Sequence, residues 1–239
     1  MLKDRPFLIS GILGLGVMAM TLFLAVLGPR EFGELPPGFF TPIIAFEFAE
    51  SPSEVYRMFI PLRAAEAMDR VNQWDFLYLI LYGLFLVAFS IACVRHTGKR
   101  FYYFIAALAL GIIVADALEN VQLLGLTYRV GLDGGHLDDL LLRLKVFTWF
   151  KWGGLALYFL LLWPYFRGQA GRLARFLSVI ALLPALTAVL AFLRRGVLNE
   201  LLALSVGLMF ILMTLYAWRQ VLANQPTEQL STDFHLSNG

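Results

Sequence analysis

Six apolar runs, each long enough to cross a bilayer, restrict this chain to a membrane fold. The first run contains no charged residue. An α-helix rises about 1.5 Å per residue, so about 20 residues cross a hydrocarbon core of ~30 Å. In lipid, backbone N–H and C=O groups must form hydrogen bonds within the protein, so runs of this length are expected to be helices. The sequence therefore predicts an all-α fold, an integral membrane bundle of six transmembrane helices within residues 1–222. The expected spans are residues 7–28, 75–95, 101–126, 138–166, 174–193 and 198–219.

Composition agrees with a lipid environment and excludes several other classes of protein. Of the 239 residues, 59% are hydrophobic and 15% charged, with a mean hydropathy of +0.73. A soluble domain usually carries about 25% charged residues. A net charge of +2 without a dense basic tract gives no reason to expect a nucleic-acid partner. The single cysteine, Cys93, excludes an internal disulfide and a multi-cysteine metal site. Membrane lipids are the expected surroundings, and no cofactor is expected.

Residues 29–73 form the longest non-spanning segment and predict a partly helical outer loop. Thr41-Pro42 resembles a helix N-cap followed by proline at the first helical position. Ser51-Pro52-Ser53-Glu54 has the pattern of a capping box. We expect two short amphipathic helices that lie on the membrane or cover the bundle. An ordinary structured loop is the alternative.

Local signals also predict how the other helices pack, begin and bend. Gly11 and Gly14 offer small-residue packing on the first span. Residues 129–137 are expected to form a glycine-rich loop, with Asp138 as the cap of the fourth span. Pro184 is expected to kink the fifth span, because proline lacks a backbone donor.

Basic residues predict the orientation of the bundle. The clusters at 95–100 and 167–175 belong to the same side as Lys3 and Arg5. Because basic residues near span ends favour the cytoplasm, we expect a multi-pass protein of the cell (inner) membrane with both termini cytoplasmic. Residues 223–239 are polar and lack an apolar period, which predicts a disordered cytoplasmic tail.

Two acids and an amide interrupt the third apolar run. Asp116, Glu119 and Asn120 are spaced i, i+3 and i+4, so their side chains share one helical face. A carboxylate at the centre of a membrane helix costs roughly 2.5–3.5 kcal/mol on insertion scales. The three residues are therefore predicted to form one wall of a polar site inside the bundle.

Sequence distances place polar residues of three spans at similar depth. Asp116 lies 16 residues after Arg100, and Lys151 lies 16 residues before Arg167, or roughly 24 Å of helix in each case. Asp75 lies close to the outer boundary by the same measure. The sequence predicts that these residues meet in the outer third of the bilayer, with Asp116 and Lys151 as an ion pair or hydrogen-bonded network.

The residues of this expected site can be assigned catalytic and ligand-binding roles. Two carboxylates beside a lysine can hold different proton affinities, which acid/base chemistry requires. Residues 133–139 carry oxygen and imidazole donors around a turn, but a turn before a helix explains them more simply than a cation site, so no metal ligands are predicted. The catalytic candidates are Asp116, Glu119 and Lys151, and the ligand-binding candidates are Asp75, Tyr78, Tyr82, Asn120 and Trp152.

Three functions fit these residues. The first is binding or modification of a lipid-like small molecule. The second is a small proton-coupled transporter that uses the acids as a relay, although no three-plus-three repeat is visible in the sequence. The third is an accessory subunit with a membrane-complex partner, in which the polar cluster only fixes helix register.

Five short segments resemble a group of uncharacterised bacterial multi-pass membrane proteins with an intramembrane Asp-x-x-Glu-Asn motif. In that group a similar first segment also precedes the second span. The resemblance covers roughly residues 44–152. The group has no known activity, so the resemblance implies only that these polar positions belong together. The segments are Ile44 to Val55, Trp74-Asp75-Phe76, Tyr82-Gly83, Ala115-Asp116 through Glu119-Asn120, and Lys151-Trp152.

Overall fold

A computed structural model describes residues 5–60, 62–132 and 136–223 of the chain. Of these residues 84% are helical and none lies in a strand, which confirms the all-α class. The predicted tail at 223–239 lies outside the described residues except for Ala223, and so does Lys3. The helices are α1 (Arg5–Leu27), α2 (Pro42–Glu47), α3 (Pro52–Met58), α4 (Leu62–Thr97), α5 (Phe101–Gly131), α6 (Asp138–Arg167), α7 (Arg172–Ile180), α8 (Leu183–Leu193) and α9 (Val197–Ala223).

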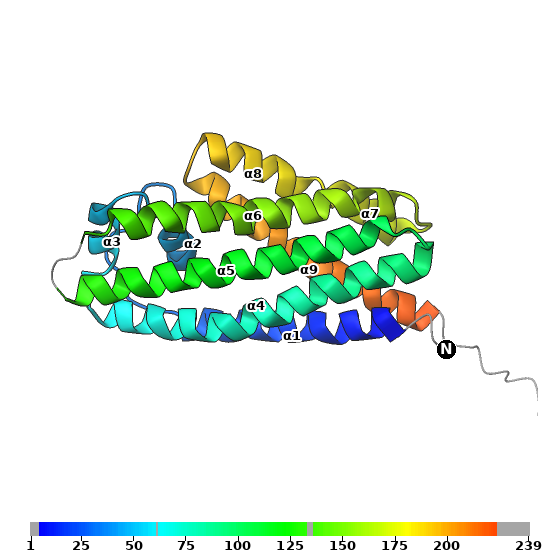
Figure 1. The fold of residues 1–239 in the computed structure, drawn as a ribbon, viewed down its shortest axis with the longest axis horizontal. Helices are drawn as coiled ribbons and strands as arrows, with labels where there is room; N and C mark the ends of the chain where they lie inside the picture. The colour runs from blue at the N-terminus through cyan, green and yellow to red at the C-terminus, as the bar shows by residue number, and fades with distance from the viewer. Residues whose placement is uncertain (1–4, 61, 133–135, 224–239) are drawn as a thin grey trace, which may run out of the picture.

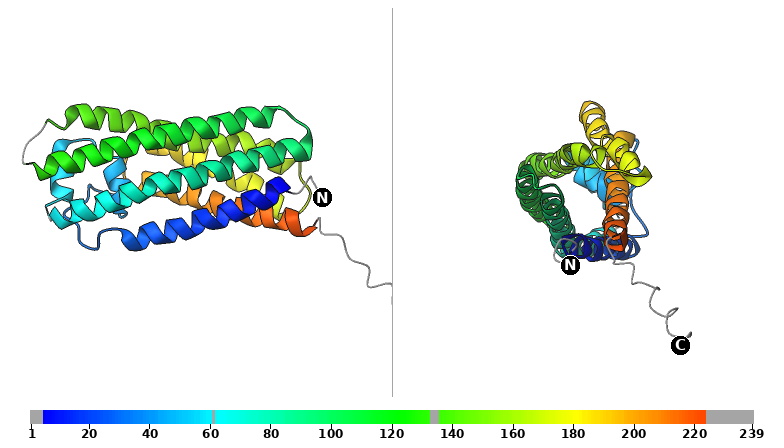
Figure 2. Two further views of the ribbon diagram at one scale, coloured as in Figure 1. Left: turned by 60° about the horizontal axis from the view of Figure 1, so that its bottom comes forward. Right: turned by 90° about the vertical axis from the view of Figure 1, so that its right-hand side faces the viewer.

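The long helices form a closed ring. Six segments within the described residues are long and apolar enough to cross a membrane, which confirms the six-span bundle. α1 packs on α4, α4 on α5, α5 on α6, α6 on α7 and α8, α8 on α9, and α9 returns to α1. Figures 1 and 2 show this elongated bundle from the side and end-on. We call the end that carries α2 and α3 the α2 end, and the end where α1 begins and α9 finishes the termini end (Figure 1).

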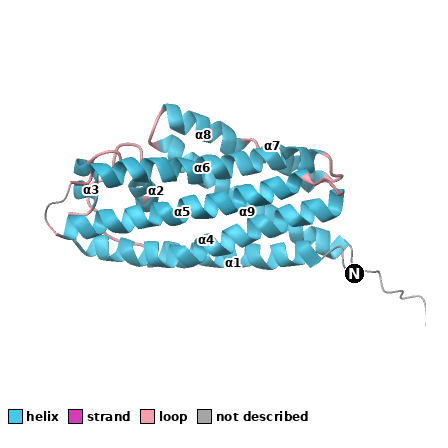
Figure 3. Cartoon of the chain, viewed as in Figure 1, coloured by secondary structure: helices cyan, strands magenta, loops and turns pink. Residues whose placement is uncertain are grey.

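The two short helices cover the α2 end of the ring, as Figure 3 also shows. Three consecutive residues of α2, Ile44, Ala45 and Phe46, are buried against the bundle. The Glu200 carboxylate of α9 accepts hydrogen bonds from the backbone N–H groups of Phe40 and Thr41, at 2.9 and 2.8 Å. This contact fixes the start of α2 between the long helices. Of the two expected positions for these helices, the one that covers the bundle is the one observed.

The caps of the two short helices follow the sequence in part. The Ser51 hydroxyl accepts from the Glu54 N–H at 3.3 Å, as the capping box predicts. The Glu54 carboxylate accepts from the N–H of Glu50 rather than of Ser51, at 2.9 Å. Thr41 precedes α2 but makes no side-chain cap. The backbone N–H of Thr41 donates to Glu200 of the distant helix α9, a contact that local sequence could not predict.

Two helices extend further than the apolar runs. α4 begins at Leu62, inside the predicted loop at 29–73. Ala64, Ala65 and Met68 are buried there, so packing stabilises helix where the hydropathy is low. α5 likewise continues to Gly131, which makes the first part of the predicted glycine-rich loop helical.

Asp138 is the first helical residue of α6, and the cap position belongs to Leu137. The prediction that Asp138 caps this helix is therefore wrong by one residue. A carboxylate in the first turn still interacts favourably with the helix dipole.

The fifth span is divided into α7 and α8 just before Pro184, where the sequence predicts a kink. The first span packs through small residues as expected. The Trp218 indole of α9 donates to the Gly11 carbonyl at 3.2 Å, and the Thr214 side chain occupies the space beside Gly14. A side chain at Gly14 would overlap Thr214, so glycine allows α1 and α9 to approach closely.

Candidate functional site

Lys151 of α6 lies at the centre of a buried group of carboxylates from two other helices. Its ammonium is 3.0 Å from Glu47 Oε1 of α2 and 3.1 Å from Asp116 Oδ1 of α5. It also pairs with Glu119 of α5. The four residues are between 0% and 7% exposed. We call Glu47, Asp116, Glu119 and Lys151 the Lys151 cluster.

Three further side chains fix the orientation of these carboxylates. The Tyr82 hydroxyl of α4 donates to Asp116 Oδ2 at 2.5 Å. The Thr148 hydroxyl donates to Glu119 Oε1 at 2.5 Å. The Trp152 indole donates to Glu47 Oε2 at 2.8 Å. Each carboxylate of the cluster thus has a second donor besides Lys151, as buried charged groups require.

The ion pair of Asp116 and Lys151 that sequence depth predicts is present. The same cluster includes Glu119, and Tyr82 and Trp152 bind to it directly. The catalytic and ligand-binding roles assigned to these residues stay predictions, as does the position of the cluster in the outer third of the bilayer. In α5, Asp116 is equidistant from Phe101 and Gly131, because the helix extends beyond the apolar run.

The remaining predicted residues lie beside the cluster. The Asn120 amide donates to Asp75 Oδ2 at 2.6 Å, which joins α5 to α4. The Tyr78 hydroxyl accepts from Thr21 of α1 at 3.1 Å, and its ring packs edge-on against Tyr82. Asp75, Asn120 and Tyr78 make no hydrogen bond or ion pair to Lys151.

Sequence reasoning did not assign Glu47 and Thr148 to the site. Glu47 belongs to the predicted outer loop at 29–73, yet in the structure α2 brings it to Lys151 of α6, beside Glu119 of α5. One sequence feature could have identified Glu47 as a site residue: it is the only charged residue in the apolar stretch 43–49. Thr148 lies three residues before Lys151, so both share one face of α6.

The cluster contains three carboxylates and a single cation. Ionised carboxylates in a low dielectric repel one another, and burial disfavours each charge. For Glu47, in the segment between the first two spans, burial raises the pKa of the carboxyl, and the Lys151 ammonium offsets part of that effect. The site therefore has an excess of acceptor oxygens that can hold protons or bind a ligand's donors.

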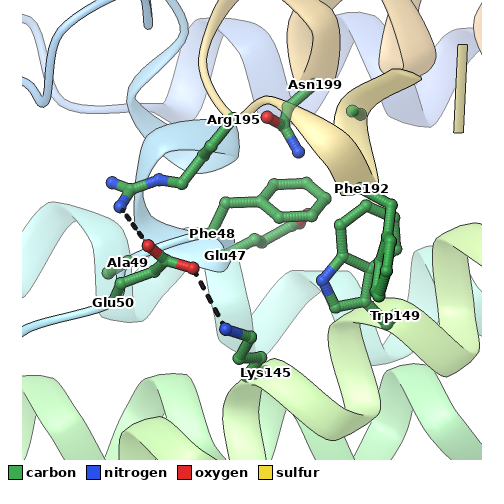
Figure 4. Close-up of a pocket in the computed structure, with 10 residues that line it drawn as sticks. Glu47, Phe48, Ala49, Glu50, Lys145, Trp149, Phe192, Arg195 and Asn199 are labelled. Atoms are coloured by element: carbon green, nitrogen blue, oxygen red, sulfur yellow. Dashed lines mark hydrogen bonds and ion pairs between the residues drawn. The ribbon is translucent and has the colours of Figure 1, made fainter. Parts of the chain in front are cut away.

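A cavity of about 130 Å³ adjoins the cluster at Glu47. It is lined by residues 47–50, by Lys145 and Trp149 of α6, by Ala191 and Phe192 of α8, and by Arg195 and Asn199 (Figure 4). We call it the Glu47 pocket. One wall is aromatic and apolar, and the opposite rim carries the charged groups of Glu50, Lys145 and Arg195. Glu47 is the residue that the pocket and the Lys151 cluster share.

The described part of the chain holds no group of three or more acidic, histidine or cysteine side chains arranged for a metal ion. In the predicted turn at 133–139, residues 133–135 lie outside the described residues. Asp139 pairs with Arg129 at 2.9 Å, so its carboxylate already has a cationic partner.

An aromatic layer separates the cluster from the termini end. Phe85 and Phe89 of α4, Phe159 of α6 and Phe210 of α9 pack together with ring centroids about 6 Å apart. Beyond this layer a second polar group begins, in which the Tyr165 hydroxyl bonds to His96 at 2.8 Å. At the level of this layer the buried hydroxyls of Ser90 and Tyr158 bond to each other at 2.9 Å.

Comparison with protein families, with curated proteins and with solved structures finds no match to this chain.

Proposed function

We propose that this polytopic membrane protein binds a lipid-like small molecule whose polar part enters the Glu47 pocket and reaches the Lys151 cluster. The observation that carries the proposal is the position of Glu47. Its side chain lines the pocket, and its two oxygens accept from Lys151 and Trp152. A molecule in the pocket is thereby next to the most acidic part of the bundle.

The walls of the pocket favour an amphiphile. Trp149 and Phe192 meet edge-on at 5.2 Å between centroids, and Phe192 is 70% exposed on the surface of α8. An acyl chain fits such a lipid-facing aromatic surface, while hydroxyl or amine donors of a headgroup fit the carboxylate side.

The Lys151 cluster can add acid/base chemistry to binding. Asp116 and Glu119 would exchange protons with the ligand, and Lys151 would orient and neutralise them. Asp75, Tyr78, Asn120 and Trp152 would shape the surrounding wall. The resemblance to bacterial membrane proteins that share these positions is consistent with a common site.

The basic residues at the termini end determine the expected orientation of the bundle in the membrane. Basic residues 95–100 and 167–175 lie at that end, so the positive-inside rule favours cytoplasmic termini. The Glu47 pocket would then open on the extracytoplasmic side of the cell membrane.

A proton-coupled transporter is the second candidate, favoured by polar pairs between α4 and α5. Thr127 donates to Asp69 at 2.5 Å, Asn120 donates to Asp75 at 2.6 Å, and Tyr82 donates to Asp116 at 2.5 Å. These pairs follow α4 and α5 from the α2 end to the cluster. Proton-linked uptake into vesicles would favour this candidate over binding alone.

Lipid that co-purifies with the protein tests the proposal. We expect wild-type protein to retain a lipid that mass spectrometry identifies, and Asp116→Asn to retain at least about tenfold less, because a charged hydrogen-bond partner is lost. Glu47→Gln should reduce retention as well. Asp139→Asn, an acid on the surface, is the matched control and should retain lipid like the wild type. Size-exclusion profiles would confirm that each variant is folded. Equal retention by Asp116→Asn and wild type would contradict the proposal.

A further inference from the structure

We propose that the Glu47 pocket binds a phosphate-type oxyanion, the phosphodiester of a lipid headgroup, through Arg195 and Asn199. This inference rests on the proposed function in that the lipid occupies the same pocket, and it adds the chemical class of the headgroup. The structure leaves two buried donors at one side of the pocket that lack an acceptor.

The first donor is the amide of Asn199. Asn199 is 1% exposed, and its Oδ1 accepts from the Gly196 N–H at 2.8 Å at the start of α9. Its Nδ2 group is buried and has no hydrogen-bond partner among the described residues. Figure 4 shows this amide beside the pocket, opposite Phe48. A buried amide donor without an acceptor is unfavourable, because it has lost its hydrogen bonds to water.

The second donor is Nε of Arg195. The terminal nitrogens of Arg195 reach Glu50 at 3.1 Å and Glu54 at 2.8 Å. Its Nε is buried and lacks a partner in the same described set of residues. Both unpartnered groups are donors with no acceptor capacity at those atoms, so the ligand that satisfies them must supply acceptor oxygens.

The rim of the pocket is already organised around an anion. The Glu50 carboxylate bridges Lys145 at 3.2 Å and Arg195 at 3.1 Å (Figure 4). Partial burial raises the pKa of Glu50, but the hydrogen bonds from Lys145 and Arg195 more than offset this, so the pKa is lowered overall. A phosphate that displaces the Glu50 carboxylate would take its place between the two cations, because guanidinium groups match phosphate oxygens geometrically.

Hydrogen bonds to Glu47 reduce the repulsion between its carboxylate and an oxyanion on this side. Its Oε1 and Oε2 are engaged by Lys151 and Trp152, on the side of the cluster. A phosphodiester near Arg195 would place the hydroxyl or amine of its headgroup within reach of Glu47, and its acyl chains along Trp149 and Phe192. One phospholipid would thus accept hydrogen bonds from Arg195 and Asn199, donate to Glu47 and pack against the apolar wall of the pocket.

Binding of three probes to detergent-purified protein tests this inference. The probes are phosphatidylglycerol, a diacylglycerol with the same acyl chains and inorganic phosphate, and the readout is the shift of the thermal unfolding midpoint with probe concentration. Asn199→Asp keeps the oxygen that caps α9 and replaces the free donor by an acceptor. Arg195→Lys keeps the charge and removes Nε. Arg194→Lys, at an exposed neighbouring position, is the matched control.

We expect wild type and Arg194→Lys to bind phosphatidylglycerol alike, and Asn199→Asp to bind it at least about tenfold more weakly. Arg195→Lys should be weakened in the same direction. Diacylglycerol should bind wild type more weakly than phosphatidylglycerol. Stabilisation by inorganic phosphate as strong as that by phosphatidylglycerol, and lost in Asn199→Asp, would support the oxyanion site with free phosphate as its source.

Equal binding of phosphatidylglycerol and diacylglycerol, unchanged binding in Asn199→Asp, or no stabilisation of wild type by either phosphate probe would overturn the inference. The proposed function is judged separately, by retention of lipid in Asp116→Asn. If Asp116→Asn loses the lipid but Asn199→Asp binds it as strongly as the wild type, the proposed function is supported and the phosphate site is not.

Discussion

Replacing Lys151 with methionine is expected to destabilise the folded protein by about 3–5 kcal/mol, because it leaves a buried group of carboxylates without its cation. The Lys151 ammonium pairs with Glu47, Asp116 and Glu119, and none of the three is more than 7% exposed. Methionine keeps the length and apolar stem of lysine, so the change is chiefly one of charge. Unfolding by denaturing detergent in micelles would measure it.

Lys145→Met is the matched control for this prediction. Lys145 lies on the same helix and pairs with Glu50 at 3.2 Å, but its side chain is 56% exposed. An exposed ion pair contributes about 0–1 kcal/mol, so this variant should stay within about 1 kcal/mol of the wild type. Similar losses in both lysine variants would mean that burial of Lys151 carries no special energetic role.

Phe89→Ala is expected to cost about 3–5 kcal/mol, since it opens a cavity in the aromatic layer. Phe89 is 0% exposed and packs on Phe7, Tyr165 and Phe166 from two other helices. Its removal deprives all three of contact atoms that lipid cannot replace inside the bundle. The same detergent titration measures the loss.

Phe104→Ala supplies the comparison for the aromatic layer. Phe104 is 61% exposed on α5, on the outer surface of the bundle. Lipid chains can fill the space that this truncation leaves, so a much smaller loss is expected than for Phe89→Ala. If Phe89→Ala proved as mild as Phe104→Ala, the layer would not be the tightly packed core described above.

Sequence periodicity and hydropathy predicted the helices because each span is predominantly apolar over about 20 residues, and a run of that length satisfies its backbone groups in lipid as a helix. The start of α4 at Leu62 could not be predicted in the same way. There the helix is stabilised by buried Ala64, Ala65 and Met68, which only the tertiary structure reveals. Hydropathy indicates which residues lie within the membrane, whereas the ends of helices outside the membrane depend on the residues that pack against them.

The meeting of Asp116 with Lys151 was predictable for a different reason. Helix rise converts sequence distance into depth, and buried charges need partners, so two opposite charges at equal depth are expected to pair. Glu47 was not predictable by that argument. Because α2 does not cross the bundle, the depth of Glu47 cannot be calculated from its sequence distance to a basic residue at the end of a span. Tyr78 shows a third limit, since periodicity could not tell a side chain that faces Lys151 from one that faces Thr21 of α1.

A double-mutant cycle between Lys151 and Asp116 tests the central claim, that these charges meet within one buried cluster, most directly. The free energy of unfolding would be measured for wild type, Lys151→Met, Asp116→Asn and the double variant. We predict strong coupling, with the double variant less destabilised than Lys151→Met alone, because removing Asp116 relieves one of the carboxylates left unpaired. Simple additivity of the two single effects would show that the two side chains do not interact, and would contradict the account.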